Sequence, residues 1–220
     1  MEIEQYVGSF DLEKTLDLRG GEEIIFGSGS PRRIEMIQKL KRPIAYLKSD
    51  LNEESFLKEE EDCIRDKDFI RKASILTTRL AYEKAKSLET EDGNLLITAD
   101  TTVLMRNKIL GKPKTQKDAE VMLKSLFGQI HFVTTGVCLY QSQDKKDLFY
   151  TTTAVKFKDL SPGLERVLHK YVKDGKAQDK AGAYGIQEEA GLFVDWVYGD
   201  YPSIIGLPLG QVYERIEKIL

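Results

Sequence analysis

The stretch from residue 24 to residue 40 constrains the fold of this 220-residue chain more than any other. Its first three residues are apolar and the run stops at Gly27, after which apolar residues recur at helical spacing from Ile34 onward. This change of period predicts a short buried strand that leads directly into a helix.

The connection between that strand and that helix has the features of an anion site. Ser30 stands where a helix is capped and Pro31 suits the first helical position, while Gly27 and Gly29 allow the backbone to turn tightly. The unpaired N–H groups at such a helix start attract an anion.

Two arginines follow the turn at once. Arg32 and Arg33 supply positive charges whose fork-shaped donors grip phosphate or carboxylate oxygens, so we interpret the segment as a phosphate cradle. An ordinary capped helix with two solvated arginines has the same composition. A dinucleotide-dependent oxidoreductase is a weaker hypothesis, because Arg32 occupies the third glycine position of that fingerprint.

Length and composition indicate one domain. A 220-residue chain that is 41% hydrophobic can bury a sizeable core, which we expect to form two lobes around a cleft. Residues 1–23 read as an N-terminal extension, with Gly20 and Gly21 at its boundary, and residues 24–220 as a single domain. The net charge of −3 gives no general attraction to nucleic acid or membranes, so any phosphate affinity must be local.

The sequence also favours a cytoplasmic location. Cys63 and Cys138 match no metal or redox spacing, and two isolated thiols are typical of a reducing compartment. The acidic start is neither a secretory signal nor a basic transit peptide, and no apolar run approaches the roughly 20 residues of a membrane-spanning helix.

Asp100 is the first candidate for chemistry. It interrupts the apolar run of residues 94–104, and a carboxylate among apolar neighbours is costly to bury without a partner. The alternative is a strand-end aspartate bonded to local amides. Lys84 extends the apolar face of the helix predicted over residues 68–88, where it either reaches past that face to water or emerges at the cleft.

Two other segments have unusual composition. Glu53 or Glu54, shortly after a second strand predicted over residues 44–47, could bind a metal, although a solvated acidic face is the plainer interpretation. The segment 179–187 is too rich in glycine and alanine to serve packing, and Gly182 and Gly185 suggest that the backbone closely approaches a ligand.

The remaining pattern alternates between helical and extended segments. It predicts a capped helix after Thr115, a hairpin of strands over 132–140 and 149–157, a helix after Ser161, a strand over 193–197 and a final helix. The two histidines, His131 and His169, lie in a strand start and a helix, so neither is assigned a catalytic role.

Six segments, in this order, resemble the Maf family of nucleotide pyrophosphatases: GSGSPRR, LAYEKA, ITADTTV, ILGKP, DKAGAYGIQ and GDYPSIIGLPL. The resemblance implies an α/β fold with an elongated mixed sheet flanked by helices, and two lobes that enclose a nucleotide cleft. It also implies hydrolysis of a nucleoside triphosphate to the monophosphate and pyrophosphate with Mg²⁺ or Mn²⁺, as a house-cleaning activity on the nucleotide pool. A homodimer is a further expectation from the family.

The same resemblance assigns roles to individual residues. It implies that Asp100 is the proton acceptor and that the remaining site residues bind the substrate: Ser28, Ser30, Arg32, Arg33, Lys84, Lys112 and Gln187. Members directed at dTTP and UTP carry the residue types found here at Arg32, Thr101 and Gln187. The implied substrates are therefore dTTP and UTP, with modified pyrimidine nucleotides kept open.

Physical chemistry gives these residues a common task. The negative charge of a triphosphate needs cations placed in advance, and a metal ion would bridge its oxygens to Glu53 and Asp100. Asp100 would act as the base for the attacking water or would hold a metal-bound water. Gln187 offers a donor and an acceptor to the edge of the base.

Two departures from the family pattern motivate an alternative function. Asn52 replaces the first residue of the usual Asp-Glu pair, and Glu188 follows Gln187 where a small residue is usual, which could narrow the pocket or repel a phosphate. The alternative is a non-catalytic nucleotide sensor that regulates cell division.

Overall fold

The computed structural model describes residues 3–14, 18, 23–51, 56, 68–88, 90 and 93–219. The strands are β1 (Gly8–Lys14), β2 (Ile24–Gly27), β3 (Ile44–Leu47), β4 (Leu95–Met105), β5 (Lys108–Leu110), β6 (Ile130–Ser142), β7 (Lys145–Phe157) and β8 (Val194–Tyr198). The α-helices are α1 (Pro31–Gln38), α3 (Phe69–Lys86), α4 (Gln116–Leu126), α5 (Pro162–Lys173), α6 (Tyr201–Ile205) and α7 (Leu209–Ile219). Three short 3-10 helices are η1 (Ile3–Gln5), η2 (Ala181–Ala183) and η3 (Glu189–Phe193).

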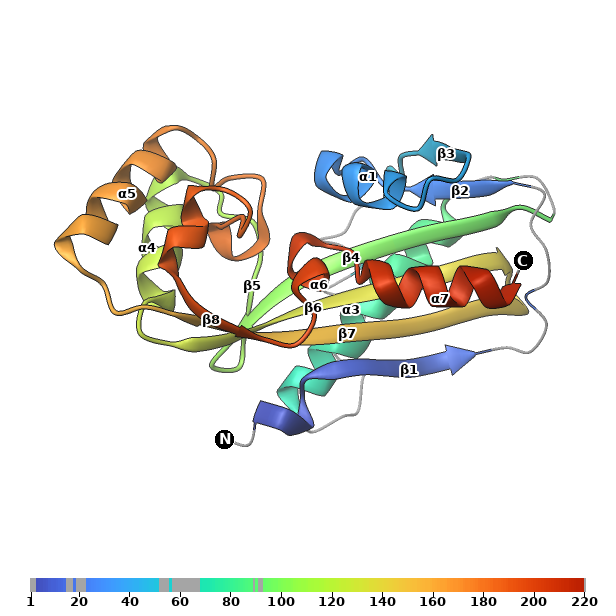
Figure 1. The fold of residues 1–220 in the computed structure, drawn as a ribbon, viewed down its shortest axis with the longest axis horizontal. Helices are drawn as coiled ribbons and strands as arrows, with labels where there is room; N and C mark the ends of the chain where they lie inside the picture. Colours follow the sequence, from blue (N-terminus) through green and yellow to red (C-terminus); the bar gives the residue numbers. More distant parts are fainter. Residues whose placement is uncertain are drawn as a thin grey trace.

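The strands form one mixed sheet, which confirms the predicted fold class. Six of them follow the order β1-β7-β6-β4-β2-β3, while β5 pairs with β4 and β8 pairs with β7. Strand β2 runs parallel to β3 and β4, and the other pairings are antiparallel. The long strands β4, β6 and β7 reach from one lobe of the molecule into the other (Figure 1).

Each lobe has its own apolar core. In the first lobe, α1 and α7 cover one face of the sheet and α3 covers the other (Figure 1). Residues of β2 therefore point alternately into two cores, with Phe26 in one and Ile25 in the other. This two-sided burial explains why β2 reads as a continuous apolar run rather than an alternating one. The second lobe packs α4 and α5 around a core that includes Leu123, Leu168 and Phe193.

The predicted strand-turn-helix is confirmed, with one difference in its capping. Helix α1 begins at Pro31 with Ser30 at the N-cap position, as expected, but the Ser30 side chain makes no capping hydrogen bond. Instead the Ser30 N–H donates to Ser28 Oγ at 3.2 Å. The predicted capping box of α4 is confirmed in full, because Thr115 and Asp118 each accept a hydrogen bond from the other's backbone.

Part of the predicted N-terminal extension is an edge strand of the sheet. Strand β1 pairs antiparallel with β7 from Gly8 to Lys14. Arg215 of α7 donates to both carboxylate oxygens of Asp147 on β7, at 2.6 and 2.7 Å, and also pairs with Asp11 on β1. The division of the chain at residue 23 stays a prediction.

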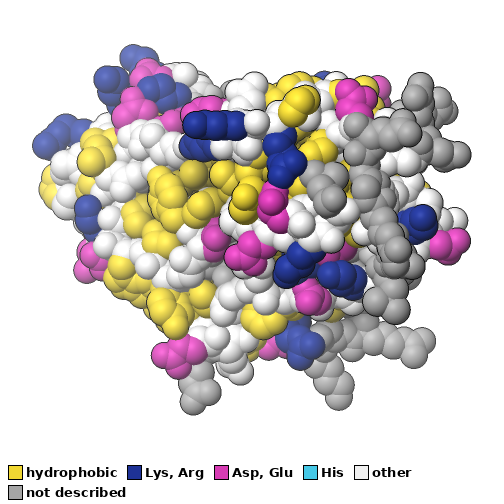
Figure 2. Space-filling model, turned by 45° about the vertical axis from the view of Figure 1, so that its right-hand side comes forward, with side chains coloured by type: hydrophobic (Ala, Val, Ile, Leu, Met, Phe, Trp, Pro, Cys, Tyr) yellow, Lys and Arg dark blue, Asp and Glu magenta, His cyan; other side chains and the backbone are white. Residues whose placement is uncertain are grey.

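The described surface carries no large area of one charge on the face shown in Figure 2, where basic, acidic and apolar side chains are interspersed. Within the described residues, none of the helices has the length and apolar character needed to cross a membrane.

Candidate functional site

The site lies where two parallel strands stop and their neighbour continues. Gly27, the last residue of β2, pairs with Thr98, but β4 runs on to Met105. Ligands of open α/β sheets bind outside the carboxyl ends of parallel strands, and here the projecting part of β4 lies in a cavity of about 940 Å³. Nine of the ten predicted site residues line this cavity: Ser28, Ser30, Arg32, Arg33, Lys84, Asp100, Thr101, Lys112 and Gln187. The tenth, Glu53, lies outside the described residues, as does Glu54.

Asp100 and Lys84 form an ion pair inside the cavity. Side chains alternate along β4, so Asp100 faces helix α3 on the same side as Thr98, whose hydroxyl donates to the Ala81 carbonyl of that helix at 2.5 Å. Lys84 Nζ lies 2.6 Å from Asp100 Oδ1, and the two side chains are only 11% and 13% exposed. Lys84 therefore emerges at the cleft rather than extending to open water. The partner of Asp100 is this ammonium and not a local amide.

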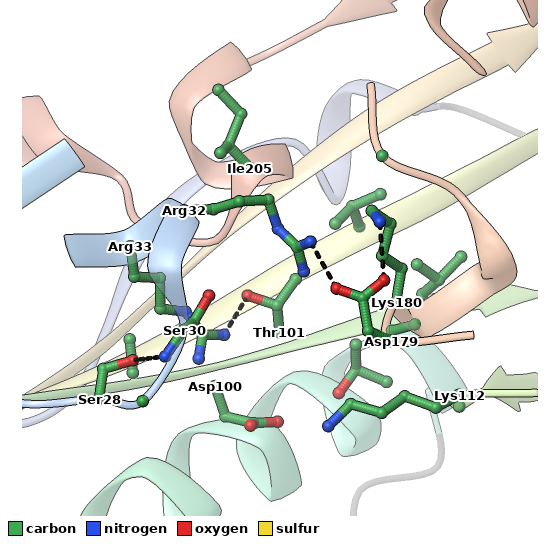
Figure 3. Close-up of a pocket in the computed structure, with 18 of the residues that line it drawn as sticks. Ser28, Ser30, Arg32, Arg33, Asp100, Thr101, Lys112, Asp179, Lys180 and Ile205 are labelled. Carbon is green, nitrogen blue, oxygen red and sulfur yellow. Dashed lines mark hydrogen bonds and ion pairs between the residues drawn. The ribbon is translucent and has the colours of Figure 1, made fainter. Parts of the chain in front are cut away.

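Arg33 is anchored on the opposite side of β4. Its Nε donates to the Gly206 carbonyl at 2.8 Å. One terminal nitrogen donates to Thr101 Oγ1, also at 2.8 Å (Figure 3). Gly206 has φ +128°, and a Cβ there would lie 2.9 Å from Arg33 Nε, so only glycine lets this chain segment approach the guanidinium. Thr101 is itself bonded to Thr135 on β6 at 2.8 Å. The charge of Arg33 is thus held in one place before any ligand binds.

Arg32 reaches across the cavity to the second lobe. Its Nη1 lies 2.9 Å from Asp179 Oδ2, and the other oxygen of Asp179 accepts from Lys180 at 2.7 Å (Figure 3). Burial alone would raise the pKa of Asp179, but the hydrogen bonds from Lys180 and Arg32 outweigh it and hold that pKa below its usual value. Arg32 is therefore paired with a carboxylate in this structure.

Lys112 lies on the connection that follows β5. Its side chain extends into the cavity on the side where Asp100 lies (Figure 3). The next residue, Pro113, is buried. The backbone carbonyl of Gly111 accepts a hydrogen bond from Gly182 at 3.1 Å, which joins the Lys112 segment to the glycine-rich one.

The two glycines of the segment 179–187 approach the protein's own side chains. Gly182 has φ +69°, and a Cβ there would lie 2.9 Å from Val103, so the ligand interpretation is wrong for this residue, which does not line the cavity. Gly185 does line it, but a Cβ there would lie 2.7 Å from Lys180 Cε. Close packing accounts for the glycine at position 182, while the approach of a ligand to the Gly185 backbone stays a prediction.

The cavity is positively charged although the chain is not. Seven basic and three acidic side chains of the described residues line it, against a net charge of −3 for the whole chain. The basic residues include three that sequence reasoning missed: Lys48, Lys114 and Lys180. Lys48 directly follows β3, which is parallel to β2 and ends at the same edge of the sheet. Its position after that strand could have marked it as a site residue. The arrangement is suited to a multiply charged anion.

A metal ion would depend on few protein ligands here. Within the described part of the chain, no group of three or more His, Cys, Asp or Glu side chains could hold one. Mg²⁺ is commonly bound by one or two carboxylates together with substrate phosphates, and Asp100 offers such a carboxylate inside the cavity. The residues present therefore fit a metal that binds together with its substrate.

Comparison with known proteins identifies the family of this chain. A sequence model of Maf-like proteins matches residues 23–219. The dTTP/UTP pyrophosphatase of Clostridium perfringens is 36% identical over 201 residues, which cover 89% of this chain and 96% of that protein. The dTTP/UTP pyrophosphatase of Thermococcus onnurineus is 35% identical over 194 residues, with coverage of 88% and 96%. The one of Thermotoga petrophila is 38% identical over 193 residues, with coverage of 88% and 87%. The chain belongs to the Maf-like protein family.

Proposed function

We propose that this protein is a nucleoside triphosphate pyrophosphatase that hydrolyses dTTP and UTP to the monophosphate and pyrophosphate. The observation that carries the proposal is the Asp100–Lys84 pair, which faces a cavity lined by seven basic side chains. The family match and the names of the relatives support the same reaction.

The phosphates bind between the two lobes in this proposal. The amides at the start of α1 and the arginines of its first turn receive the triphosphate, with Lys112 on the opposite side. Because Arg33 is already fixed by Gly206 and Thr101, its charge stabilises the transition state without reorganisation. Arg32 exchanges Asp179 for a phosphate oxygen.

Asp100 is the general base. Water attacks the α-phosphorus and gives its proton to Asp100, while the bond from that phosphorus to the bridging oxygen breaks and pyrophosphate leaves with the electron pair. Lys84 fixes the orientation of the Asp100 carboxylate at 2.6 Å. A bound Mg²⁺ or Mn²⁺, held by Asp100 and by Glu53, would neutralise phosphate charge.

Base selection rests on Gln187 in this proposal. Its amide offers both a donor and an acceptor to the uracil or thymine edge. The Thr101 hydroxyl is engaged with Arg33 and Thr135, so we infer that Thr101 acts by holding Arg33 rather than by contacting the base.

The test is a product assay with UTP, dTTP, CTP, GTP and ATP in Mg²⁺ that separates pyrophosphate from phosphate. Pyrophosphate release should favour UTP and dTTP, and Asp100→Asn should lower kcat about 100-fold or more. Asp195→Asn is the matched control, because Asp195 is an exposed strand residue outside the cavity. Release of phosphate and a diphosphate, or full activity of Asp100→Asn, would refute the assignment, and binding without turnover would favour a nucleotide sensor.

The cellular location and the oligomeric state of the enzyme are part of the same proposal. The buried, unpaired Cys138 is consistent with a reducing compartment, and we propose the cytoplasm. A homodimer remains the family expectation, which sedimentation of the purified protein would test.

A further inference from the structure

Lys180 is a cavity-lining cation that is already saturated with protein oxygens. Its side chain is 6% exposed, and its ammonium lies 2.7 Å from Asp179 Oδ1, 3.0 Å from Glu188 Oε1 and 2.6 Å from the Lys176 carbonyl oxygen. An ammonium has three N–H groups, and these three oxygens can take all of them. Lys180 is therefore poorly suited to bind a phosphate.

Glu188 lies between Lys180 and a buried tyrosine. The Tyr171 hydroxyl donates to Glu188 Oε2 at 2.8 Å and accepts the backbone N–H of Gly185 at 3.1 Å. The backbone N–H of Glu188 in turn donates to the Gly185 carbonyl at 3.0 Å. The chain from Gly185 to Glu188 is thus closed on itself, and the Glu188 carboxylate, although it lines the cavity, is bonded to Tyr171 and Lys180.

Gln187 lies inside this closed loop, one residue before Glu188. Its side chain is exposed and lines the cavity, so the point from which this side chain extends depends on the backbone. On the other side of Lys180, Asp179 holds Arg32 across the cavity at 2.9 Å. One bonded series therefore connects the segment of Gln187 to Arg32, two positions that face the nucleotide.

We propose that Lys180 and Glu188 are positioning residues for base selectivity, which hold the Gln187 backbone so that its amide meets the base in one orientation. This inference rests on the proposed function and assigns a role to the carboxylate that stands where a small residue is usual. Selection of uracil over cytosine needs the donor and acceptor of the amide at a set distance from the edge of the base, and a backbone that shifts at Gln187 would let the amide adjust to either base.

The experiment compares two neighbouring glutamates. Glu188→Ala should lower the ratio of kcat/KM for UTP to that for CTP about 10-fold, because the Gln187 segment loses its clamp. Glu189→Ala is the control, since Glu189 pairs with Lys176 outside the cavity and its loss should leave the ratio unchanged. Partial unfolding does not change this ratio of kcat/KM values, because it lowers the concentration of active enzyme equally for UTP and CTP.

A second variant tests whether the two residues act as one clamp. Lys180→Met should lower the same ratio, and the double variant with Glu188→Ala should lower it no further, because residues of one network are not additive. Additive losses, an unchanged ratio in Glu188→Ala, or equal changes in the two glutamate variants would each overturn the proposal. If the wild type releases no pyrophosphate, the proposed function has failed. The same ratio is then read from the dissociation constants of UTP and CTP by calorimetry, and the positioning role stands or falls on it.

Discussion

The two sides of the cavity are built by different means. The cradle side, residues 27–33, is a tight turn and a helix start held by neighbours in sequence, such as the bond from Ile34 N–H to the Ser30 carbonyl at 3.0 Å. The clamp side, residues 179–188, also has local bonds, such as the one from Glu188 N–H to the Gly185 carbonyl at 3.0 Å, but it is held in addition by distant side chains, including Tyr171. Local backbone chemistry shapes the first side, whereas buried polar contacts between distant segments shape the second.

The largest expected effect is an acid sensitivity that arises where Tyr184 of the clamp side contacts β6. Tyr184 is bonded at 2.8 Å to His131, a fully buried residue, and burial lowers the pKa of His131 to about 3. Between pH 6.5 and 3 the unfolded chain binds a proton that the folded chain refuses, so stability falls as the pH falls through this window. The loss should reach about 4 to 5 kcal/mol at the lower end.

The comparison is between the wild type and His131→Gln, whose side chain carries no charge at any pH. Urea unfolding at pH 7, 6, 5 and 4 should give a steeper fall for the wild type, by about 1.4 kcal/mol per pH unit below pH 6. A difference in unfolding free energy between the two proteins that is the same at every pH does not affect this test. Parallel curves would mean that His131 is not held neutral by its burial.

The next effect tests the cradle side. Arg33→Lys keeps the charge but cannot reach both Gly206 and Thr101 with one planar fork, so kcat/KM should fall about 100-fold, or roughly 3 kcal/mol. Arg32→Lys should cost much less, because Arg32 is part exposed and its partner Asp179 is a carboxylate that a lysine can also pair with. Steady-state kinetics with UTP measure both, and equal losses would show that the anchoring of Arg33 is unimportant.

The sequence predicts the cradle side better than the clamp side, because distant contacts contribute more to the clamp side. The turn, the start of α1 and the site residues of the cradle side follow from local rules, and only the capping hydrogen bond expected from the Ser30 side chain is not made. On the clamp side the composition was noticed, but Gly182 was misread as facing a ligand. Lys180 was missed because its partners include Glu188, eight residues away, and a carbonyl that no sequence pattern marks.

A pair of glycine substitutions, one on the clamp side and one just before it, separates packing from backbone strain. Gly182 and Gly175 have similar positive φ values, +69° and +75°, but a Cβ meets Val103 at the first and nothing within 4 Å at the second. Gly175→Ala should therefore cost about 1 kcal/mol of unfolding free energy, and Gly182→Ala about 2 to 3 kcal/mol.

Urea unfolding measures both variants. Adding Val103→Ala to Gly182→Ala should remove the clash with Val103 but not the backbone strain. The double variant should therefore lose less unfolding free energy than the sum of the losses of the two single variants. Equal costs for the two glycine variants would show that the close approach to Val103 places no demand on position 182.

The smallest effect concerns the ion pair that joins the two sides. Arg32 and Asp179 have side chains that are 30% and 63% exposed, so the pair should contribute less than about 1 kcal/mol, and less still at high salt. Because its partners hold the pKa of Asp179 below the usual value, this contribution is present above the unfolded pKa near 4 and is lost as the pH falls through the lower folded pKa. The difference in unfolding free energy between the wild type and Asp179→Asn should accordingly be small at pH 7 and vanish near pH 2. A difference that persists in acid would mean that Asp179 stabilises the clamp side by packing, and that the two sides are joined by more than a screened surface charge.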